Sequence, residues 1–233
     1  MFARAYVENG AKVYITSRKA DACNALADEL SEFGKCTAIP ADLSKMEEVE
    51  RLGSEIESRE DALHILVNNA GATWGATFDA FPEAAWDKVM DLNVKSVFFL
   101  TQRLLKVLEA AASDDDYARV INIGSVDGLH VSPIEAYSYA ASKAAVHHLT
   151  RMMAKFLAAK RIAVNGVAPG YFPTKMTNGI AAEFGEPTRL STPLRRWGVP
   201  SDMAGIAIYL GSKASNFVCG AIIPVDGGFA TTV

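Results

Sequence analysis

The chain of 233 residues carries 23 basic and 27 acidic side chains, and half of its residues are hydrophobic. This composition is typical of a soluble globular protein, and the length suits one α/β domain, so we expect a single domain over residues 1–233. The net charge is −4 and no block of like charges occurs, which argues against binding to nucleic acid or to a membrane surface.

The apolar runs are too short for a membrane span, which requires roughly 20 consecutive residues; the longest surround Ser96–Leu100. Cys23, Cys36 and Cys219 lie far apart and form no CxxC pair, as is typical of reduced thiols in the cytosol. The first residues lack the apolar core and the cleavage site of a targeting peptide. We therefore expect a cytoplasmic protein.

Predicted strands and helices alternate along the chain. β-branched and apolar runs predict strands over 11–18, 36–44, 62–71, 119–125, 162–170 and 221–228. Helical patterns cover 1–9, 19–33, 46–59 and 83–112, a stretch around Tyr139, and a segment opened by Pro200, whereas the residues up to about Val199 are expected to be irregular. Apolar strands separated by helices predict a Rossmann-like, doubly wound parallel sheet with helices on both faces.

The chain begins in an unusual way for this fold. Residues 1–9 already form a helical pattern with one apolar face, and Asn9-Gly10 ends it directly before the first predicted strand. A doubly wound sheet has a strand and a glycine-rich turn ahead of its first helix, and no GxGxxG occurs in the chain. We therefore expect the sequence to be N-terminally incomplete, with about 20 or more further residues in the active protein.

Four polar residues stand out against apolar surroundings. Tyr139 and Lys143 are four residues apart on an Ala-rich helix, and side chains at this spacing are neighbours on a helix surface. Ser125 ends an apolar strand, at the edge where open α/β sheets bind their ligands. Asn93 lies in a long apolar helix, so it either caps an irregularity or orders a water. A YxxxK pattern alone occurs often by chance, so the prediction depends on the combination.

These residues have the order and spacing of the short-chain dehydrogenase/reductase family, which the chain resembles from about Lys12 to Gly228. The shared motifs are Asn68-Asn69-Ala70-Gly71, Asn93, Ser125, Tyr139-x-x-x-Lys143, Pro169-Gly170 with Thr174, and Val225-Asp226-Gly227-Gly228. Because the motifs extend over nearly the whole chain, the joint resemblance is highly specific.

The resemblance implies a reductase in which Tyr139 donates a proton to a substrate carbonyl oxygen as hydride arrives from the cofactor. Ser125 would hydrogen-bond that oxygen and hold it in place. Lys143 would lower the tyrosine pKa, together with the positive charge of an oxidised nicotinamide, and would hold the nicotinamide ribose. Asn93 would hold a water in a relay to Lys143.

The residues after the first predicted strand, Ser17, Arg18 and Lys19, bear on the choice of cofactor. An acid here would bind ribose hydroxyls and favour NAD, whereas basic side chains suit the 2′-phosphate of NADPH. We therefore expect NADPH; the alternative is that Arg18 and Lys19 are merely solvated at a helix start. By resemblance, the cofactor contacts are Ser17, Arg18, Asp42, Leu43, Asn69, Ala70, Gly71, Tyr139, Lys143, Pro169, Gly170 and Thr174.

Other chemistries find less support in the sequence. His147 and His148 are adjacent and point to different faces of a helix, unlike the i, i+4 histidines of a metal helix, and His64 and His130 have no partner pattern. Ser125 lacks the GxSxG context of a hydrolase nucleophile. We therefore expect neither a metal site nor a hydrolase.

The substrate is indicated by resemblance. The segment Lys175–Val199 is the only stretch long enough to form a lid over a substrate. PLRRWGVPSDMAGIAIYL resembles bacterial 3-oxoacyl-thioester reductases, and VINIGSV, FPTKMT and RWGVP resemble in particular the type associated with rhamnolipid synthesis. This implies NADPH-dependent reduction of a 3-oxoacyl thioester on coenzyme A or an acyl carrier protein. The alternative within the family is another alcohol, such as a steroid or a sugar.

Two further expectations concern partners. Lys160-Arg161 and Arg195-Arg196 offer positive charge to an acidic carrier protein, although solvated surface charge is the simpler interpretation. Helix 83–112 and the Tyr139 helix carry more apolar residues than one sheet face requires, and the family pairs these helices in homodimers or homotetramers. A non-enzymatic, reductase-like interaction protein is the alternative to an enzyme, and only the missing glycine-rich turn favours it.

Overall fold

The computed structural model describes residues 1–132, 134–174, 177–230 and 232, with no description of the side chains of 178–184. The strands are β1 (Val13–Ile15), β2 (Cys36–Ala38), β3 (Ile65–Asn68), β4 (Ala118–Ile123), β5 (Ile162–Pro169) and β6 (Ile222–Val225). The α-helices are α1 (Phe2–Glu8), α2 (Ala20–Ser31), α3 (Met46–Arg59), α4 (Glu83–Met90), α5 (Ser96–Arg103), α6 (Leu105–Ala111), α7 (Tyr137–Leu157), α8 (Asn178–Ser191) and α9 (Pro200–Gly211). None of the described helices is long and apolar enough to cross a membrane.

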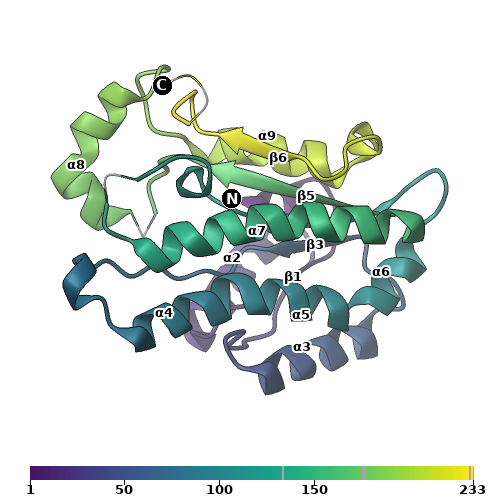
Figure 1. Ribbon diagram of the computed structural model, residues 1–233. Coiled ribbons are helices and arrows are strands. Elements are labelled where there is room, and N and C mark those ends of the chain that lie inside the picture. The colour runs from purple at the N-terminus through teal and green to yellow at the C-terminus, as the bar shows by residue number, and fades with distance from the viewer. Residues whose placement is uncertain (133, 175–176, 231, 233) are drawn as a thin grey trace.

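Every strand pair is parallel, which confirms the predicted α/β class. The pairs form two sheets, one of β1 and β2 and one in the order β3-β4-β5-β6. Strands separated by helices must cross over, and so the carboxyl ends of the strands meet at one edge of the molecule (Figure 1). Among the described residues no strand lies between β1 and β3. The expected N-terminal extension stays a prediction.

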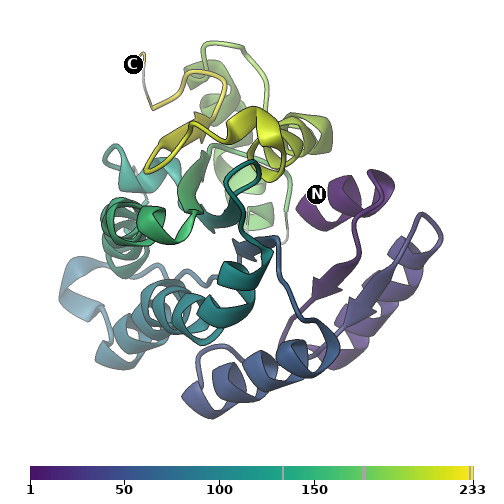
Figure 2. The same ribbon diagram turned by 90° about the vertical axis from the view of Figure 1, so that its right-hand side faces the viewer.

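Helices cover both faces of the larger sheet. On one face α3, α5, α6 and α7 bury a continuous apolar core, which includes Val49, Leu100, Leu108 and Val146. On the other face α1 and α9 pack together although they come from opposite ends of the chain (Figure 2). The Tyr6 hydroxyl donates to the carbonyl of Ala207 over 2.9 Å, which joins these two helices.

A buried polar network joins β3 and β4 to α5 and α7. Asn68 and Asn122 are register partners on β3 and β4, and the amide of Asn68 donates to the Oδ1 of Asn122 over 2.8 Å. Asn68 also donates to Thr101 on α5, and Asn122 donates to Thr150 on α7, over 3.1 and 2.9 Å. All four residues are buried, so these bonds satisfy groups that would otherwise be unpaired in an apolar core.

Two predicted segments differ from the structure. The helix expected over 83–112 is divided into α4, a π-helical turn η2 (Asp91–Lys95), α5 and α6. Asn93 in the π-helical turn bonds to Ala72 and Ser142 on other segments. The segment up to Val199, expected to be irregular, contains α8. Pro187, a residue that usually disfavours the interior of a helix, lies inside α8. Lys175 and Met176, at the start of the expected lid, lie outside the described residues.

Candidate active site

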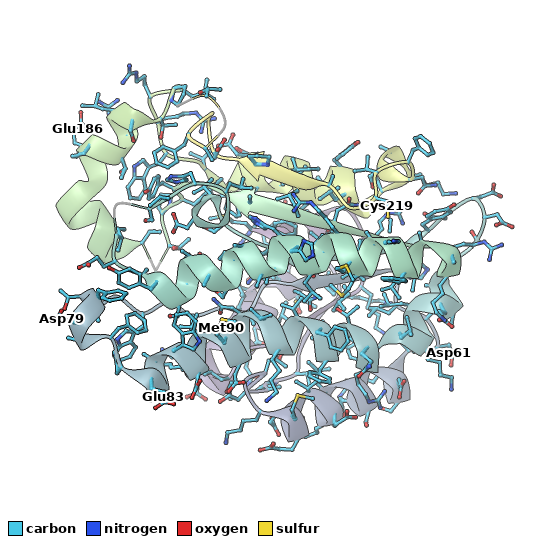
Figure 3. The ribbon with its side chains drawn as sticks, viewed as in Figure 1. Asp61, Asp79, Glu83, Met90, Glu186 and Cys219 are labelled. Carbon is cyan, nitrogen blue, oxygen red and sulfur yellow. The ribbon has the colours of Figure 1, made fainter. Side chains whose placement is uncertain are left out.

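The candidate site lies at the edge where the parallel strands end, which is where open α/β sheets bind their ligands. Ser125 follows β4, Asn69–Gly71 follows β3, and Gly170 follows β5. Figure 3 places Glu186 of α8 and Asp79 of η1 (Phe78–Ala80) toward this end of the molecule, and Cys219 toward the opposite end. The alternating fold therefore brings together residues that are far apart in the chain.

Ser125 is fixed by the turn that it begins. It is 7% exposed and has extended backbone, and it is the N-cap of the 3₁₀ turn η3 (Val126–Gly128). Its hydroxyl oxygen accepts the amide hydrogen of Asp127 over 3.1 Å. The same hydroxyl interacts with the phenol of Tyr139, where it favours the ionised form. A serine held by its own turn can present its hydroxyl hydrogen in one direction.

Tyr139 lies in the first turn of α7, and its pKa is shifted from the usual value. Burial raises the pKa of Tyr139 to about 12, Ser125 lowers it in part, and the carboxylate of Asp127 raises it further. In the ligand-free chain the net shift is upward because desolvation of the phenolate dominates. The predicted lowering by Lys143 together with an oxidised nicotinamide stays a prediction. The tyrosine is a protonated phenol at neutral pH.

Lys143 lies one helical turn beyond Tyr139 and is 5% exposed. Its Nζ donates to the carbonyl oxygen of Ile123 over 2.8 Å and lies 5.5 Å from the centroid of the Tyr139 ring. Burial lowers the pKa of Lys143 to about 8, and Asp127 opposes this shift. The ammonium has further hydrogens besides the one that Ile123 accepts, so it can bind another acceptor at the same edge.

Asn93 occupies the π-helical turn and is 1% exposed. Its amide exchanges two hydrogen bonds with the backbone of Ala72, over 2.8 and 2.9 Å, and donates to the hydroxyl of Ser142 over 2.9 Å. Both hydrogens of the side-chain amide are thus donated, so a water held by Asn93 must donate to its side-chain or backbone oxygen. The alternative expectation, that Asn93 stabilises a helix irregularity, matches these contacts.

Gly71 separates Asn93 from Lys143. A Cβ at this position would lie 3.4 Å from the Asn93 Oδ1 and 3.7 Å from the Lys143 Nζ. Gly170 is similarly constrained, since a Cβ there would lie 2.8 Å from the Cα of Asp226. These glycines keep open the space between the strand ends and the loop after β6. The predicted Asn69, Ala70 and Pro169 line the same edge.

The residues predicted to choose the cofactor lie at the ends of β1 and β2 and face solvent. Ser17 and Arg18 are exposed, and the guanidinium of Arg18 helps to lower the pKa of Asp42, although hydrogen bonds from Ser44 contribute more. The side chain of Leu43 is buried in the core, so only its backbone is free to meet an adenine. Arg18 and Asp42 are thus brought close together, as the cofactor interpretation requires.

Thr174 lies in the exposed segment after β5 that leads to α8. Its hydroxyl oxygen lies 3.0 Å from the hydroxyl oxygen of Thr177, and its backbone amide donates to that Thr177 oxygen over 2.9 Å. These local bonds fix a turn next to Gly170. The residue therefore stands at the edge of the site, without a described contact to Ser125, Tyr139 or Lys143.

Several residues of the site were not predicted. Asp127, two residues after Ser125, has its pKa raised by burial, and its Oδ1 lies 3.9 Å from the Nε2 of His130. The His130 ring packs against Phe229, Phe229 against Tyr171, and Tyr171 against Trp197, with centroids 4.7, 5.3 and 5.9 Å apart. An acid in a glycine-flanked loop was the one available signal, and the direction of its side chain depends on the turn.

A cavity of about 540 Å³ lies behind this aromatic row. Its walls come from the loops that follow β5 and β6 and from the loop after α8, and they include Tyr171, Phe172, Pro193 and Leu194. The Arg196 in its wall is paired with Asp202. Within the described part of the chain, no group of three or more His, Cys, Asp or Glu side chains is placed to hold a metal ion.

Comparison with known proteins decides the family. A family model described as enoyl-(acyl carrier protein) reductase matches residues 1–230. The rhamnolipids biosynthesis 3-oxoacyl-[acyl-carrier-protein] reductase of Pseudomonas aeruginosa is 47% identical over 231 residues, 98% of this chain and 90% of the relative. The chain belongs to the short-chain dehydrogenase/reductase family. It is an oxidoreductase similar to 3-oxoacyl reductases, so the non-enzymatic alternative is not supported.

Other similar proteins are named for activity on sugar acids. The 5-keto-D-gluconate 5-reductase of Escherichia coli K12 is 36% identical and covers 96% of this chain and 87% of its own. The Pseudomonas aeruginosa RhlG/NADP active-site complex has a TM-score of 0.95 over 98% of this chain and 90% of its own, at 47% identity. A gluconate 5-dehydrogenase from Burkholderia cenocepacia, in complex with NADP and tartrate, has a TM-score of 0.91 at 33% identity and covers 100% of this chain and 90% of its own.

Proposed function

We propose that the chain reduces a 3-oxoacyl thioester to the 3-hydroxyacyl product with NADPH, and that Tyr139 is the proton donor. The observation that carries this is the grouping of Tyr139, Ser125 and Lys143 at the strand edge, within a family of oxidoreductases. NADPH would supply the hydride. Ser125 would donate a hydrogen bond to the carbonyl oxygen as negative charge develops on it.

The high pKa of Tyr139 suits this direction of reaction. With its pKa raised to about 12, the phenol is protonated at neutral pH, and a proton donor is what a reduction needs. Lys143 next to it stabilises the phenolate that remains after the proton has left. Oxidation of the alcohol would need the phenolate from the start, and burial disfavours it.

The residues fit NADPH at both of its ends. At the nicotinamide end, Gly71 leaves room beside the Lys143 ammonium, which would bind the ribose hydroxyls. At the adenosine end, Arg18 is exposed next to Asp42 and would bind the 2′-phosphate. Among the described residues no glycine-rich turn is available for the pyrophosphate.

The acyl substrate is supported by the similarity to the rhamnolipid-associated reductase and by the aromatic row of Tyr171, Trp197 and Phe229. These rings offer an apolar wall that begins at His130, whose ring packs against Phe229 and lies beside Asp127 of the Ser125 turn, and such a wall suits a hydrocarbon chain better than a polyol. A carrier protein finds less support, since Lys160, Arg161 and Arg196 are each paired with an acid of this chain. We therefore propose that recognition depends chiefly on the acyl chain.

Substrate competition tests the proposal. NADPH oxidation is measured with 3-oxoacyl-coenzyme A of several chain lengths, with the same acyl groups on acyl carrier protein, and with 5-keto-D-gluconate. We expect the highest kcat/KM with a 3-oxoacyl thioester. A higher value with the sugar acid would favour the second candidate, a sugar-acid reductase, which the relative from Escherichia coli supports.

We also propose a homodimer or homotetramer that pairs α4, α5 and α7, which lie side by side on one surface (Figure 1). Large apolar side chains are exposed on these helices, namely Trp86, Phe98, Met152 and Phe156. Exposed apolar area of this kind marks association sites. Light scattering at micromolar concentration should give a dimer or tetramer, and Phe156→Glu should weaken it. A monomeric unmodified chain would contradict the proposal.

A further inference from the structure

His147 is a buried titratable residue that the proposed reaction does not use. It lies on α7 one turn beyond Lys143, on the stripe that also carries Tyr139, and it is 3% exposed. The neighbouring His148 is exposed. Burial of a polar ring costs desolvation free energy, so the contacts that His147 makes need an explanation.

The imidazole of His147 touches the Ser125 turn at three points. Its Nε2 accepts the backbone amide hydrogen of Ser125 over 3.4 Å. A Cβ on Gly124 would overlap the Nε2 and lie 2.6 Å from the Cδ2, and a Cβ on Gly128 would lie 2.8 Å from the Cε1. The ring thus fills the space between the two glycines on either side of the serine.

The bond to Ser125 requires a neutral ring with a free Nε2. Burial lowers the pKa of His147 to about 4, and a contact with the backbone of Gly128 opposes this only in part. At neutral pH the ring is therefore uncharged and accepts through Nε2, and its proton is on Nδ1.

We propose that His147 is a positioning residue that fixes the Ser125 hydroxyl, by accepting the Ser125 amide hydrogen and by filling the space between Gly124 and Gly128. The inference rests on the proposed role of Ser125 in holding the substrate carbonyl. Backbone bonds hold the main chain of the turn, among them that from the Gly128 amide to the Ser125 carbonyl over 3.1 Å, and the Asp127 amide bonds to the Ser125 hydroxyl. His147 adds a side-chain restraint on the Ser125 amide from outside the turn. Without His147 the hydroxyl samples several directions. The negative charge that develops on the substrate oxygen in the transition state is then stabilised less.

A near-isosteric pair of variants separates hydrogen bonding from packing. His147→Gln keeps an acceptor near the Nε2 position, whereas His147→Met has similar volume without one. We expect His147→Met to lower kcat on the order of tenfold at unchanged KM for NADPH, and His147→Gln to retain most of the activity, since one hydrogen bond is at stake. His148→Met is the matched control and should be normal.

Amide exchange gives a readout that does not depend on turnover. The Ser125 amide should exchange on the order of ten times faster in His147→Met than in His147→Gln, because only the second retains its acceptor. Equal exchange and equal activity in the two variants would overturn the proposal. If Ser125→Ala retains full activity, the proposed function fails instead, while the exchange result still reports on His147.

Two further measurements cover the case in which the methionine variant does not fold. In the unmodified chain, nitrogen NMR of the His147 ring should show the proton on Nδ1; a proton on Nε2 would overturn the proposal, because that atom must accept. Gly124→Ala should be strongly impaired, and His147→Ala in the same chain should recover part of the activity, since it makes room for the new methyl group. Failure of this rescue in a folded double variant would count against the packing role.

Discussion

Around Tyr139 the polar side chains are buried and held by neighbours, whereas at the end of β1 they face solvent with few partners. Asn93, Ser125 and Lys143 are 1, 7 and 5% exposed, and each has hydrogen bonds to groups on other elements or within its own turn. Ser17 and Arg18 are exposed, and the only described bond of their side chains is a long one from the Lys19 amide to the Ser17 hydroxyl.

The difference indicates which part of the site is organised before a ligand arrives. Groups fixed in a buried setting need no reorganisation when charge develops on the substrate, which is what a reacting centre requires. Exposed groups become ordered only on binding, so they affect affinity and choice of cofactor rather than the chemical step. Substitutions in the two regions should therefore change different kinetic constants.

The largest effect is expected in the buried region. Tyr139→Phe removes the proton donor, and we expect kcat to fall by about 10²–10⁴-fold, with NADPH affinity nearly unchanged. Steady-state kinetics and fluorescence titration of NADPH measure the two quantities. Tyr137→Phe, two residues earlier and exposed, is the control. Near-normal turnover of Tyr139→Phe would exclude this residue from the mechanism.

The second largest effect is expected on the free energy of unfolding in acid, when His147 is replaced. With the pKa of His147 lowered to about 4 in the folded chain, the unfolded chain binds more protons between pH 6.5 and 4, so stability falls as the pH falls. The contribution lost over this range is at most about 3 kcal/mol. His147→Met lacks this pH dependence, so urea unfolding should show the unmodified chain losing stability relative to the variant as the pH falls through this range. A constant difference in the free energy of unfolding would show that the buried ring is not kept neutral.

A smaller effect is expected in the exposed region. Arg18→Ala should raise the KM for NADPH about ten- to a hundredfold, because one charge-assisted contact is lost, while the KM for NADH changes little. The turnover number should be unaffected in either case, in contrast to Tyr139→Phe. Equal changes with both cofactors would mean that Arg18 is only a surface charge.

The smallest effect concerns Asp127. Its carboxylate raises the pKa values of both Tyr139 and Lys143, so Asp127→Asn should lower both. Because the reduction needs a protonated tyrosine, its loss at alkaline pH should begin at a lower pH. Asp79→Asn on the exposed η1 turn is the control. An unchanged pH profile would place Asp127 outside the electrostatics of the site.

The fold class and the grouping of the site followed from local patterns in the sequence. Apolar strands alternating with helices determine a parallel sheet, and the residues that end the strands must then share an edge, which is why Ser125, Gly71 and Gly170 could be placed together. The i, i+4 spacing likewise placed Tyr139 and Lys143 on one stripe. Periodicity and chain order were enough for the fold class. The selection of Gly170 and the roles of Ser125, Tyr139 and Lys143 came from the resemblance to the short-chain dehydrogenase/reductase family.

What could not be predicted depends on contacts between segments far apart in the chain. Asn93 in the π-helical turn bonds to Ala72 and Ser142, which no local pattern reveals. The upward shift of the Tyr139 pKa in the ligand-free chain could not be predicted, because charges can be counted in a sequence but desolvation cannot. His147 was judged only as a metal ligand, and its contact with the Ser125 turn depends on the packing of α7.

The paired amides of Asn68 and Asn122 bear on the fidelity of folding. A one-residue slip between two strands turns their side chains to opposite faces, and apolar strands such as β3 and β4 have little in their own sequence to oppose it. Here a slip would separate the amides of Asn68 and Asn122 from each other and from the Thr101 and Thr150 hydroxyls, which would keep only their bonds to Val97 and Val146 on their own helices. Each such group costs about 1–3 kcal/mol. The network therefore discriminates against misaligned pairing, so the distance from Asn69 to Ser125 at the strand ends is set when the sheet forms.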